Sequence, residues 1–310
     1  MDNLPVIAIR FALYADLMVL AGMTAFSLYG LRGVERSSGI LPLARPAIVL
    51  ALFGLVLSGL GMLALAASMI GSSVWAVDGE TLGAIISESA IGTAWLVRMA
   101  AMFLAVIAAM VLRRNPVAGG IALLAATSIA IATLVWTGHA GATEGWTGTA
   151  HRISDIIHML AAAVWIGGLA AFAWILYRPL NGGLRVYLPV AHRALEQFSR
   201  IGTLAVGALI ATGIVNSLAV IGISQLSQLA QNDYAKLLGV KLLLFAAMLA
   251  LAAFNRWRLT PALGIGIADG SPAAAVASLR RSLLFESSAA LAILALVAWL
   301  GTLEPLANSG

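Results

Sequence analysis

Eight long apolar stretches, separated by shorter polar connections, dominate the pattern of the chain. Each stretch is about as long as the 20 or so residues that an α-helix needs to cross a bilayer core of about 30 Å. The predicted spans are roughly 7–30, 46–70, 91–112, 118–137, 150–176, 200–222, 235–257 and 282–303. We therefore expect an all-α polytopic membrane protein, folded as a bundle of eight transmembrane helices.

The connections between the predicted spans are too short to hold a soluble domain, since the longest have about 20–25 residues. Residues 1–310 are therefore expected to form a single transmembrane domain. Within the connection after the second span, segment 79–92 has the pattern of a short amphipathic helix at the membrane surface.

Charged residues alternate in sign from one connection to the next. The connections after the odd-numbered spans are rich in arginine: Arg32, Arg36, Arg45, Arg113, Arg114, Arg178, Arg185, Arg193, Arg256, Arg258 and Arg280. Those after the even-numbered spans carry Asp78, Glu80, Glu88, Glu144 and Asp233. Because basic connections stay in the cytoplasm, both termini are predicted to be extracytoplasmic.

Composition agrees with a membrane protein and changes how the basic charge is interpreted. Hydrophobic residues make up 61% of the chain and charged residues 10%, against about 25% charged residues in soluble domains. The net charge of +5 is therefore attributed to retained cytoplasmic loops and not to nucleic-acid binding. The chain has no cysteine, which excludes disulfides and thiolate metal sites.

Three of the four histidines, His139, His151 and His158, fall within twenty residues around the fourth connection, with Asp155 between the last two. On a helix, His151, Asp155 and His158 occupy one face, within an arc of about 60°. The short hairpin before the fifth span brings His139 close to His151. Because His151 and His158 are about 10.5 Å apart along the axis, the pattern favours a relay over one cage. His139 and His151 would form an outer step, and Asp155 and His158 a deeper one.

Ionisable residues also occur inside four of the spans. Asp16, Arg98, Asp155, His158 and Lys241 all lie roughly 10 Å below the predicted outer boundary. Charges at this depth normally face a bundle interior or a pathway. Asp16, Arg98 and Lys241 are thus either structural partners or part of a pathway. Asp155 is either a metal ligand or an ion-pair partner of Arg98 or Lys241.

Four other polar residues receive structural interpretations. Glu286 is expected to pair locally with Arg280 and Arg281, and His192 to be solvated in a cytoplasmic loop. Asn216 and Asn255 are expected to form hydrogen bonds between helices.

Three blocks of the chain resemble the CopD family of bacterial copper-resistance inner-membrane proteins. They are "GHA…HRISDIIHMLAAAVWIGGL", "EQFSRIGTLAVGALIATGIVNS" and "DYAKLLGVKLLLFAAMLALAAFNRWRLTP". Ala235 departs from the pattern, which has glycine after the tyrosine. The resemblance implies copper homeostasis at the inner membrane, with copper, as Cu(I) or Cu(II), moving from periplasm to cytoplasm. It also implies a periplasmic copper-binding partner of the CopC type, and it maps the family's histidines onto His139, His151 and His158.

Three alternatives remain at this stage. A haem-binding electron carrier needs two axial histidines at matched depth, and only His158 is deep. A metal-dependent membrane enzyme lacks an HExxH or comparable motif, so the chain is expected not to be an enzyme. A scaffold that hands copper on without transporting it has the same sequence features as a transporter.

Overall fold

Eight helices that are long and apolar enough to span a membrane make up most of the described part of the chain. The computed structural model describes residues 4–138, 141, 145–177, 185–221 and 233–303. The long helices are α1 (Leu4–Gly30), α2 (Ala44–Ile70), α4 (Ala90–Val111), α5 (Pro116–Ala132), α7 (Gly145–Leu176), α8 (Arg185–Ile221), α9 (Asp233–Phe254) and α11 (Ala273–Leu300). The prediction of an all-α bundle of eight spans is confirmed.

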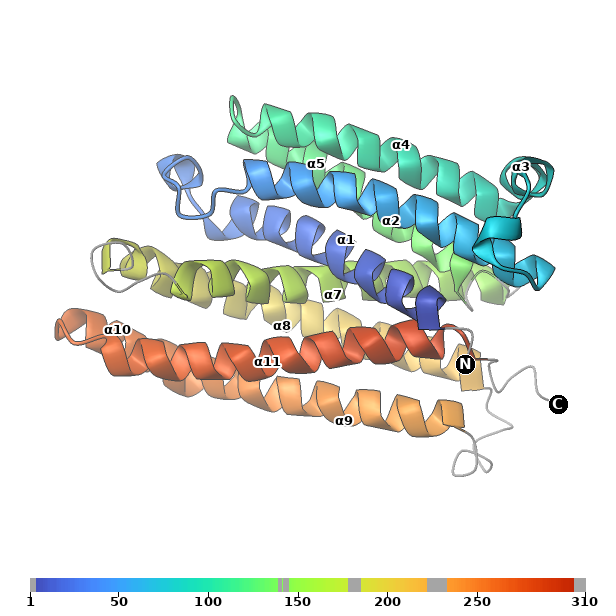
Figure 1. Ribbon diagram of the computed structural model, residues 1–310. Helices are drawn as coiled ribbons and strands as arrows, with labels where there is room; N and C mark the ends of the chain where they lie inside the picture. The colour runs from blue at the N-terminus through green and yellow to red at the C-terminus, as the bar shows by residue number, and fades with distance from the viewer. Residues whose placement is uncertain (1–3, 139–140, 142–144, 178–184, 222–232, 304–310) are drawn as a thin grey trace.

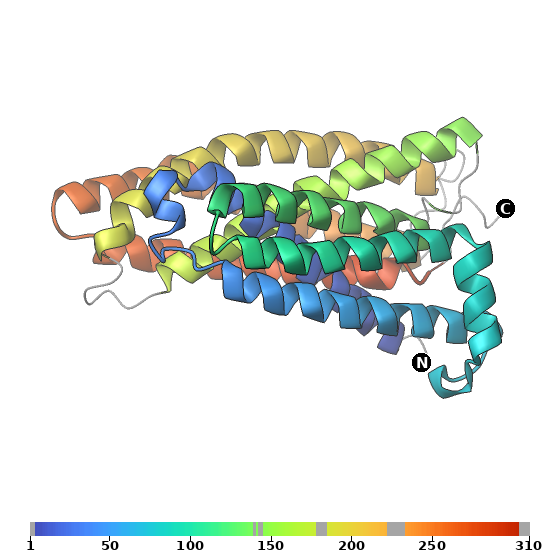
Figure 2. The ribbon, with the colours of Figure 1, turned by 90° about the horizontal axis from the view of Figure 1, so that it is seen from above.

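Shorter elements connect or extend these helices. They are η1 (Gly33–Arg36), η2 (Val74–Ala76), α3 (Gly79–Glu88), η3 (Thr133–Thr137), the π-helical turn η6 (Asn255–Leu259) and α10 (Thr260–Ala268). Helix α3 lies across the end of the bundle, beside α2 and α4 (Figures 1 and 2). Asp78 caps it by accepting a hydrogen bond of 2.7 Å from the Thr81 N–H. Segment 79–92 thus contains the short helix that its pattern predicts.

Helices α1 and α7 lie in the middle of the bundle, between α2, α4 and α5 on one side and α8, α9 and α11 on the other (Figure 1). They cross in direct backbone contact at Gly22 and Gly167. A Cβ built on Gly167 would lie 2.0 Å from the Gly22 carbonyl carbon. Close crossings of this kind rely on small residues, because a side chain would hold the two backbones apart.

Helix α8 begins well before the predicted span, at Arg185 and not near residue 200. Its first turns bury Leu188, Ala191 and Ala194, which follow one another at helical spacing. Pro189 removes only one backbone hydrogen bond near the helix start, where several N–H groups are in any case unpaired. Hydropathy marks the membrane-crossing part of a helix, so it missed this amphipathic extension.

The extension also corrects the interpretation of His192. This residue lies in α8 and not in a loop, and its ring is half-buried. Its Nε2 is 3.1 Å from the Thr260 carbonyl oxygen at the start of α10, and its ring packs against Gly264. His192 therefore joins two helices at the end of the bundle that carries the Arg-rich connections.

The first and last spans meet at the opposite end of the bundle. Arg10 of α1 donates hydrogen bonds to the carbonyl oxygens of Gly301, just after α11, and of Thr137, at the end of η3. The start of α1 and the end of α11 therefore share one end, as an even number of spans requires (Figure 1). Arg10 is an intramembrane charge whose role the sequence pattern did not reveal.

An ion pair ties the first connection to α8 at the Arg-rich end. The Arg193 Nη2 donates to both carboxylate oxygens of Glu35, at 2.6 and 2.5 Å. Partial burial disfavours the charged form of the Glu35 carboxylate and, on its own, would raise its pKa. The hydrogen bonds from the Arg32 backbone N–H and from Arg193 outweigh it and hold the pKa of Glu35 below its ordinary value of 4.5.

We expect this pair to stabilise the fold in a pH-dependent way. A carboxylate with a lowered folded-state pKa contributes stability above pH 4.5, and the contribution is lost as pH falls through the folded-state value. Arg193→Gln should therefore cost about 1 kcal/mol at pH 7, and less below pH 4.5. Thermal unfolding in detergent across this range measures the difference. Gln at the exposed Arg200 on the same helix is the control, and an equal loss at every pH would contradict the assignment.

Candidate functional site

A polar interface between α7 and α8 surrounds two of the predicted site residues. The His158 Nδ1 lies 2.9 Å from the Thr212 Oγ1, and the Asn216 Nδ2 donates to the Asp155 Oδ1 at 3.1 Å. Thr212 and Asn216 are four residues apart, so they present one face of α8 to the shared face of Asp155 and His158. The Ser154 hydroxyl adds a bond of 3.3 Å to the Thr212 carbonyl oxygen.

The hydrogen bonds of Thr212 are compatible with a His158 ring that is protonated on Nδ1. The Thr212 hydroxyl donates its one hydrogen to the Ala208 carbonyl oxygen, at 2.6 Å. With its hydrogen used in this way, the Thr212 oxygen accepts from the His158 Nδ1, which corresponds to the neutral ring protonated on Nδ1; a hydroxyl turned toward the ring corresponds to the other tautomer. The ring also makes a hydrogen bond to the Leu209 backbone. In the tautomer protonated on Nδ1, Nε2 carries the lone pair that a metal could use. This is the arrangement in which a histidine binds a metal through Nε2 and is oriented through Nδ1.

Asp155 faces Lys241 of α9 and is attracted to it electrostatically. The two side chains are not in direct ion-pair contact, and neither are Asp155 and Arg98, within the described chain. The Asp155 Oδ1 accepts the hydrogen bond from Asn216, and the Asp155 Oδ2 takes no part in that bond. Of the two ion-pair partners considered for Asp155, Lys241 is the one that is electrostatically attracted to it.

Arg98 is held on the other side of α1. Its Nε donates to the Ser58 hydroxyl of α2 at 3.2 Å, and the Trp95 Nε1 donates to the Ser58 carbonyl oxygen at 2.9 Å. The Arg98 Nη1 is buried without a hydrogen-bond partner among the described residues. Tyr14 of α1 is within electrostatic range of both Arg98 and Asp155, so it lies between the two groups of polar residues.

Asp16 is set apart from these contacts. It is 4% exposed, and neither of its carboxylate oxygens has a hydrogen-bond partner among the described residues. A Cβ added at Gly54 would lie 2.7 Å from the Asp16 Oδ2 and 2.5 Å from the Met102 methyl carbon. Asp16 therefore faces a glycine of α2 and a thioether of α4, not a cation.

The outer step of the predicted relay is only partly described. His151 is buried in α7, six residues after the helix begins, while His139 lies outside the described residues. Among the residues that the structure does describe, no group of three His, Asp or Glu side chains converges as a metal cage. His151 and His158 lie seven residues apart on α7, and the relay stays a prediction.

The two intramembrane asparagines form the interhelical hydrogen bonds expected of them, and one of these corrects the interpretation of Glu286. The Asn255 side chain donates to the Glu286 carboxylate across η6 and α11. Arg280 instead donates to the Leu176 carbonyl oxygen, at 2.7 Å, and Arg281 lies over the Phe285 ring. Glu286 is buried in α11 and makes no ion pair within the described chain, so the predicted pairing with Arg280 and Arg281 is wrong.

Sequence reasoning did not identify Ser58, Tyr14 or Thr212 as neighbours of the charged residues. Hydroxyl groups inside spans usually bond to their own helix, as Thr24 does with the Leu20 carbonyl oxygen, so they carry little signal. The four-residue spacing of Thr212 and Asn216 was the one available indication that α8 presents a polar face.

Two family models match the chain, and each covers one part of it. The model described as Copper resistance protein D-like, N-terminal domain, matches residues 1–149, and the model described as Copper resistance protein D matches residues 192–300. Copper resistance protein D of Pseudomonas syringae pv. tomato is 39% identical over 305 residues, which is 98% of each chain. The chain belongs to the copper resistance protein D family. The family consists of copper-resistance membrane proteins and is not an enzyme family.

Two further relatives extend the comparison. Inner membrane protein YebZ of Escherichia coli (strain K12) is 28% identical over 261 residues, 82% of this chain and 84% of that protein. Copper transport protein CutJ of Bacillus subtilis (strain 168) is 29% identical over 120 residues, 39% of this chain and 21% of that protein. No solved structure gives a significant match.

The two segments matched by the family models contribute the charged and polar residues on either side of α7. Asp16 and Arg98 belong to the first segment, and Thr212, Asn216 and Lys241 to the second. Most of α7 lies between the two segments, with Asp155 and His158 on it. In this member of the copper resistance protein D family, α7 therefore joins the two segments and carries the histidines at their junction.

Proposed function

We propose that this protein takes up copper from the periplasm and passes it across the bacterial inner membrane toward the cytoplasm. Copper is its substrate and not a resident cofactor. His139 and His151 provide the outer step, and Asp155 and His158 the inner step, of a relay along the face of α7.

The observation that carries the proposal is the contact of the His158 Nδ1 with Thr212, which leaves Nε2 for a metal when Nδ1 carries the proton. Imidazole nitrogen suits both copper oxidation states, and a neutral imidazole binds without adding charge to the membrane interior. Thr212 fixes the ring, so the nitrogen is ready to receive an ion. Asp155, three residues away on the same helix, supplies a carboxylate that offsets the charge of the ion during passage.

Lys241 is proposed to weaken the binding of copper at the inner step. An ammonium group that attracts Asp155 without touching it competes with a copper ion for the carboxylate. Such competition keeps binding weak enough for the ion to leave, which conduction through any pathway requires. Asp16, Arg98 and Lys241 are proposed to hold this charge balance and not to ligate copper.

The names of the relatives support copper as the substrate and the inner membrane as the location. Two of the three are described by copper resistance or copper transport, and the third as an inner membrane protein.

The distribution of arginines supports extracytoplasmic termini. With this orientation, the His139–His151 hairpin would face the periplasm. A periplasmic copper-binding protein of the CopC type would deliver the ion there.

Copper uptake into proteoliposomes tests the proposal directly. The purified chain is reconstituted, a copper chelator is enclosed in the vesicles, and Cu(I), Cu(II) or Zn(II) is added outside. We expect accumulation of copper well above that of protein-free vesicles, and little accumulation of zinc.

Two other results would favour the alternatives. Copper binding to the purified chain with no uptake above the protein-free vesicles would indicate a scaffold that hands copper on. A red purified protein with a Soret band would indicate a haem-binding electron carrier.

A further inference from the structure

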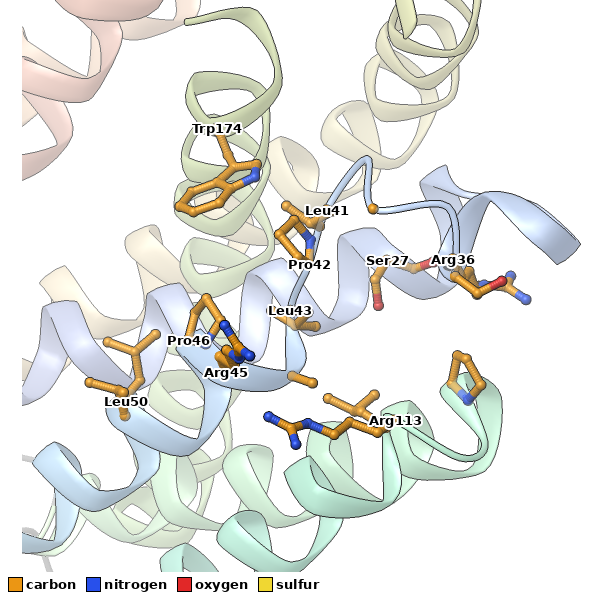
Figure 3. A pocket seen from close by; sticks show the side chains of 16 residues that line it. Ser27, Arg36, Leu41, Pro42, Leu43, Arg45, Pro46, Leu50, Arg113 and Trp174 are labelled. Atoms are coloured by element: carbon orange, nitrogen blue, oxygen red, sulfur yellow. Dashed lines mark hydrogen bonds between the residues drawn. The ribbon is translucent and has the colours of Figure 1, made fainter. Parts of the chain in front are cut away.

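A basic cavity lies at the Arg-rich end of the bundle, away from the copper site. It is an open cavity with a volume of about 860 Å³, lined by the connection between α1 and α2, the start of α2, the α4–α5 turn and the end of α7. Arg36, Arg45 and Arg113 line it, each from a different segment (Figure 3). A cavity of this size accommodates a small molecule or a lipid headgroup.

The charges in the cavity are all of one sign. None of the described residues that line it is acidic. Arg36 is fixed by hydrogen bonds to the carbonyl oxygens of Ser27 and Leu28, at 3.0 and 2.7 Å. Arg45 and Arg113 are exposed and make no ion pair within the described chain. Two guanidinium groups thus remain available to an anion, beside a third that is held in place.

The rest of the cavity is apolar. Leu41, Leu43, Leu50 and Leu112 form its wall, with Pro42 and Pro46 beside them (Figure 3). Val49 and Trp174 also line it and are 63% and 44% exposed, so the apolar wall continues onto the outer surface of α2 and α7. That surface faces lipid in a membrane-spanning bundle. The ligand that fits must therefore combine an anionic group with a hydrocarbon part.

We propose that this cavity binds the headgroup of an anionic phospholipid. The phosphate contacts Arg45 and Arg113, and an acyl chain leaves along Val49 and Trp174. Basic pockets between helices on the cytoplasmic side of a membrane are suited to such headgroups. A bound lipid also joins the first connection to the α4–α5 turn, so it stabilises the packing of these segments. The site does not depend on the proposed copper transport.

Retention of lipid by the purified chain tests the proposal. The protein in neutral detergent is mixed with phosphatidylglycerol or phosphatidylcholine, and bound lipid is measured by native mass spectrometry and by thermal stabilisation. We expect phosphatidylglycerol to be preferred. In the Arg45→Gln/Arg113→Gln double variant its binding should be about 25-fold weaker, because each basic residue contributes about a fivefold factor at an anionic surface.

Arg114→Gln is the matched control. Arg114 is adjacent to Arg113 and exposed but does not line the cavity, so this variant should keep the preference. Glycerophosphoglycerol, which has the headgroup without acyl chains, should compete poorly. Three results would overturn the proposal: equal retention of both lipids, equal loss in Arg114→Gln and in the double variant, or full competition by glycerophosphoglycerol. If the double variant does not fold, the lipid preference of the unmodified protein and the competition still decide.

Discussion

Replacing His158 by alanine is expected to lower copper uptake into proteoliposomes at least about tenfold, while the protein still folds. The change removes Nε2, the nitrogen proposed to bind copper at the inner step. It also removes a half-buried ring that packs beside Gly213. The measurement is the initial rate of copper accumulation at equal amounts of reconstituted protein.

Thr212 provides a sharper form of the same experiment, because it acts on His158 without being a ligand. Thr212→Val removes the oxygen that accepts from Nδ1 and frees the ring to change tautomer. Loss of such an orienting partner typically costs 10- to 100-fold in metal affinity or activity. Thr212→Ser keeps the hydroxyl and should retain uptake. Equal uptake in the valine and serine variants would show that the orientation of His158 is unimportant.

A histidine outside the proposed relay serves as the control for the loss of a histidine as such. His192 contacts the Thr260 carbonyl oxygen at the other end of the bundle, so His192→Ala should leave the copper rate per folded molecule unchanged. If His158→Ala also left it unchanged, the inner step of the relay would be wrong.

Adding one methyl group at Gly22 or Gly167 is expected to be among the most destabilising single changes in the protein. A Cβ at Gly22 would lie 1.8 Å from the Ala163 carbonyl oxygen, and one at Gly167 would lie 2.0 Å from the Gly22 carbonyl carbon. Both obstacles are backbone atoms, which cannot move aside without separating α1 from α7. We expect a cost of about 3 kcal/mol or more, measured as thermal stability and monodispersity in detergent.

Glycines in open positions of other spans are matched controls for this prediction. A Cβ at Gly59 in α2 or Gly207 in α8 would meet no atom within 4 Å. Gly→Ala at either position should be neutral or slightly stabilising, because alanine favours the helix by up to about 1 kcal/mol. A similar loss of stability at Gly59 and Gly167 would show that helix crossing is not the cause.

The number of spans and their approximate positions could be predicted from the sequence, because crossing a bilayer requires a local run of apolar residues. The common face of Asp155 and His158 was equally accessible, since helical periodicity places residues three and four apart together. The early start of α8 could not be predicted from the sequence in this way. Leu188, Ala191 and Ala194 become a buried stripe only because neighbouring helices cover them.

Apolar runs and helical periodicity were enough to assign the class of protein, the spans and the helix that carries the histidines. The contact of Thr212 with His158, the attraction of Asp155 to Lys241 and the bond between Glu286 and Asn255 became known from the folded bundle alone. These contacts depend on the rotation and register of one helix against another. That relation is set by side-chain packing across the whole bundle, as at the crossing of Gly22 and Gly167, and no periodicity within a single span encodes it.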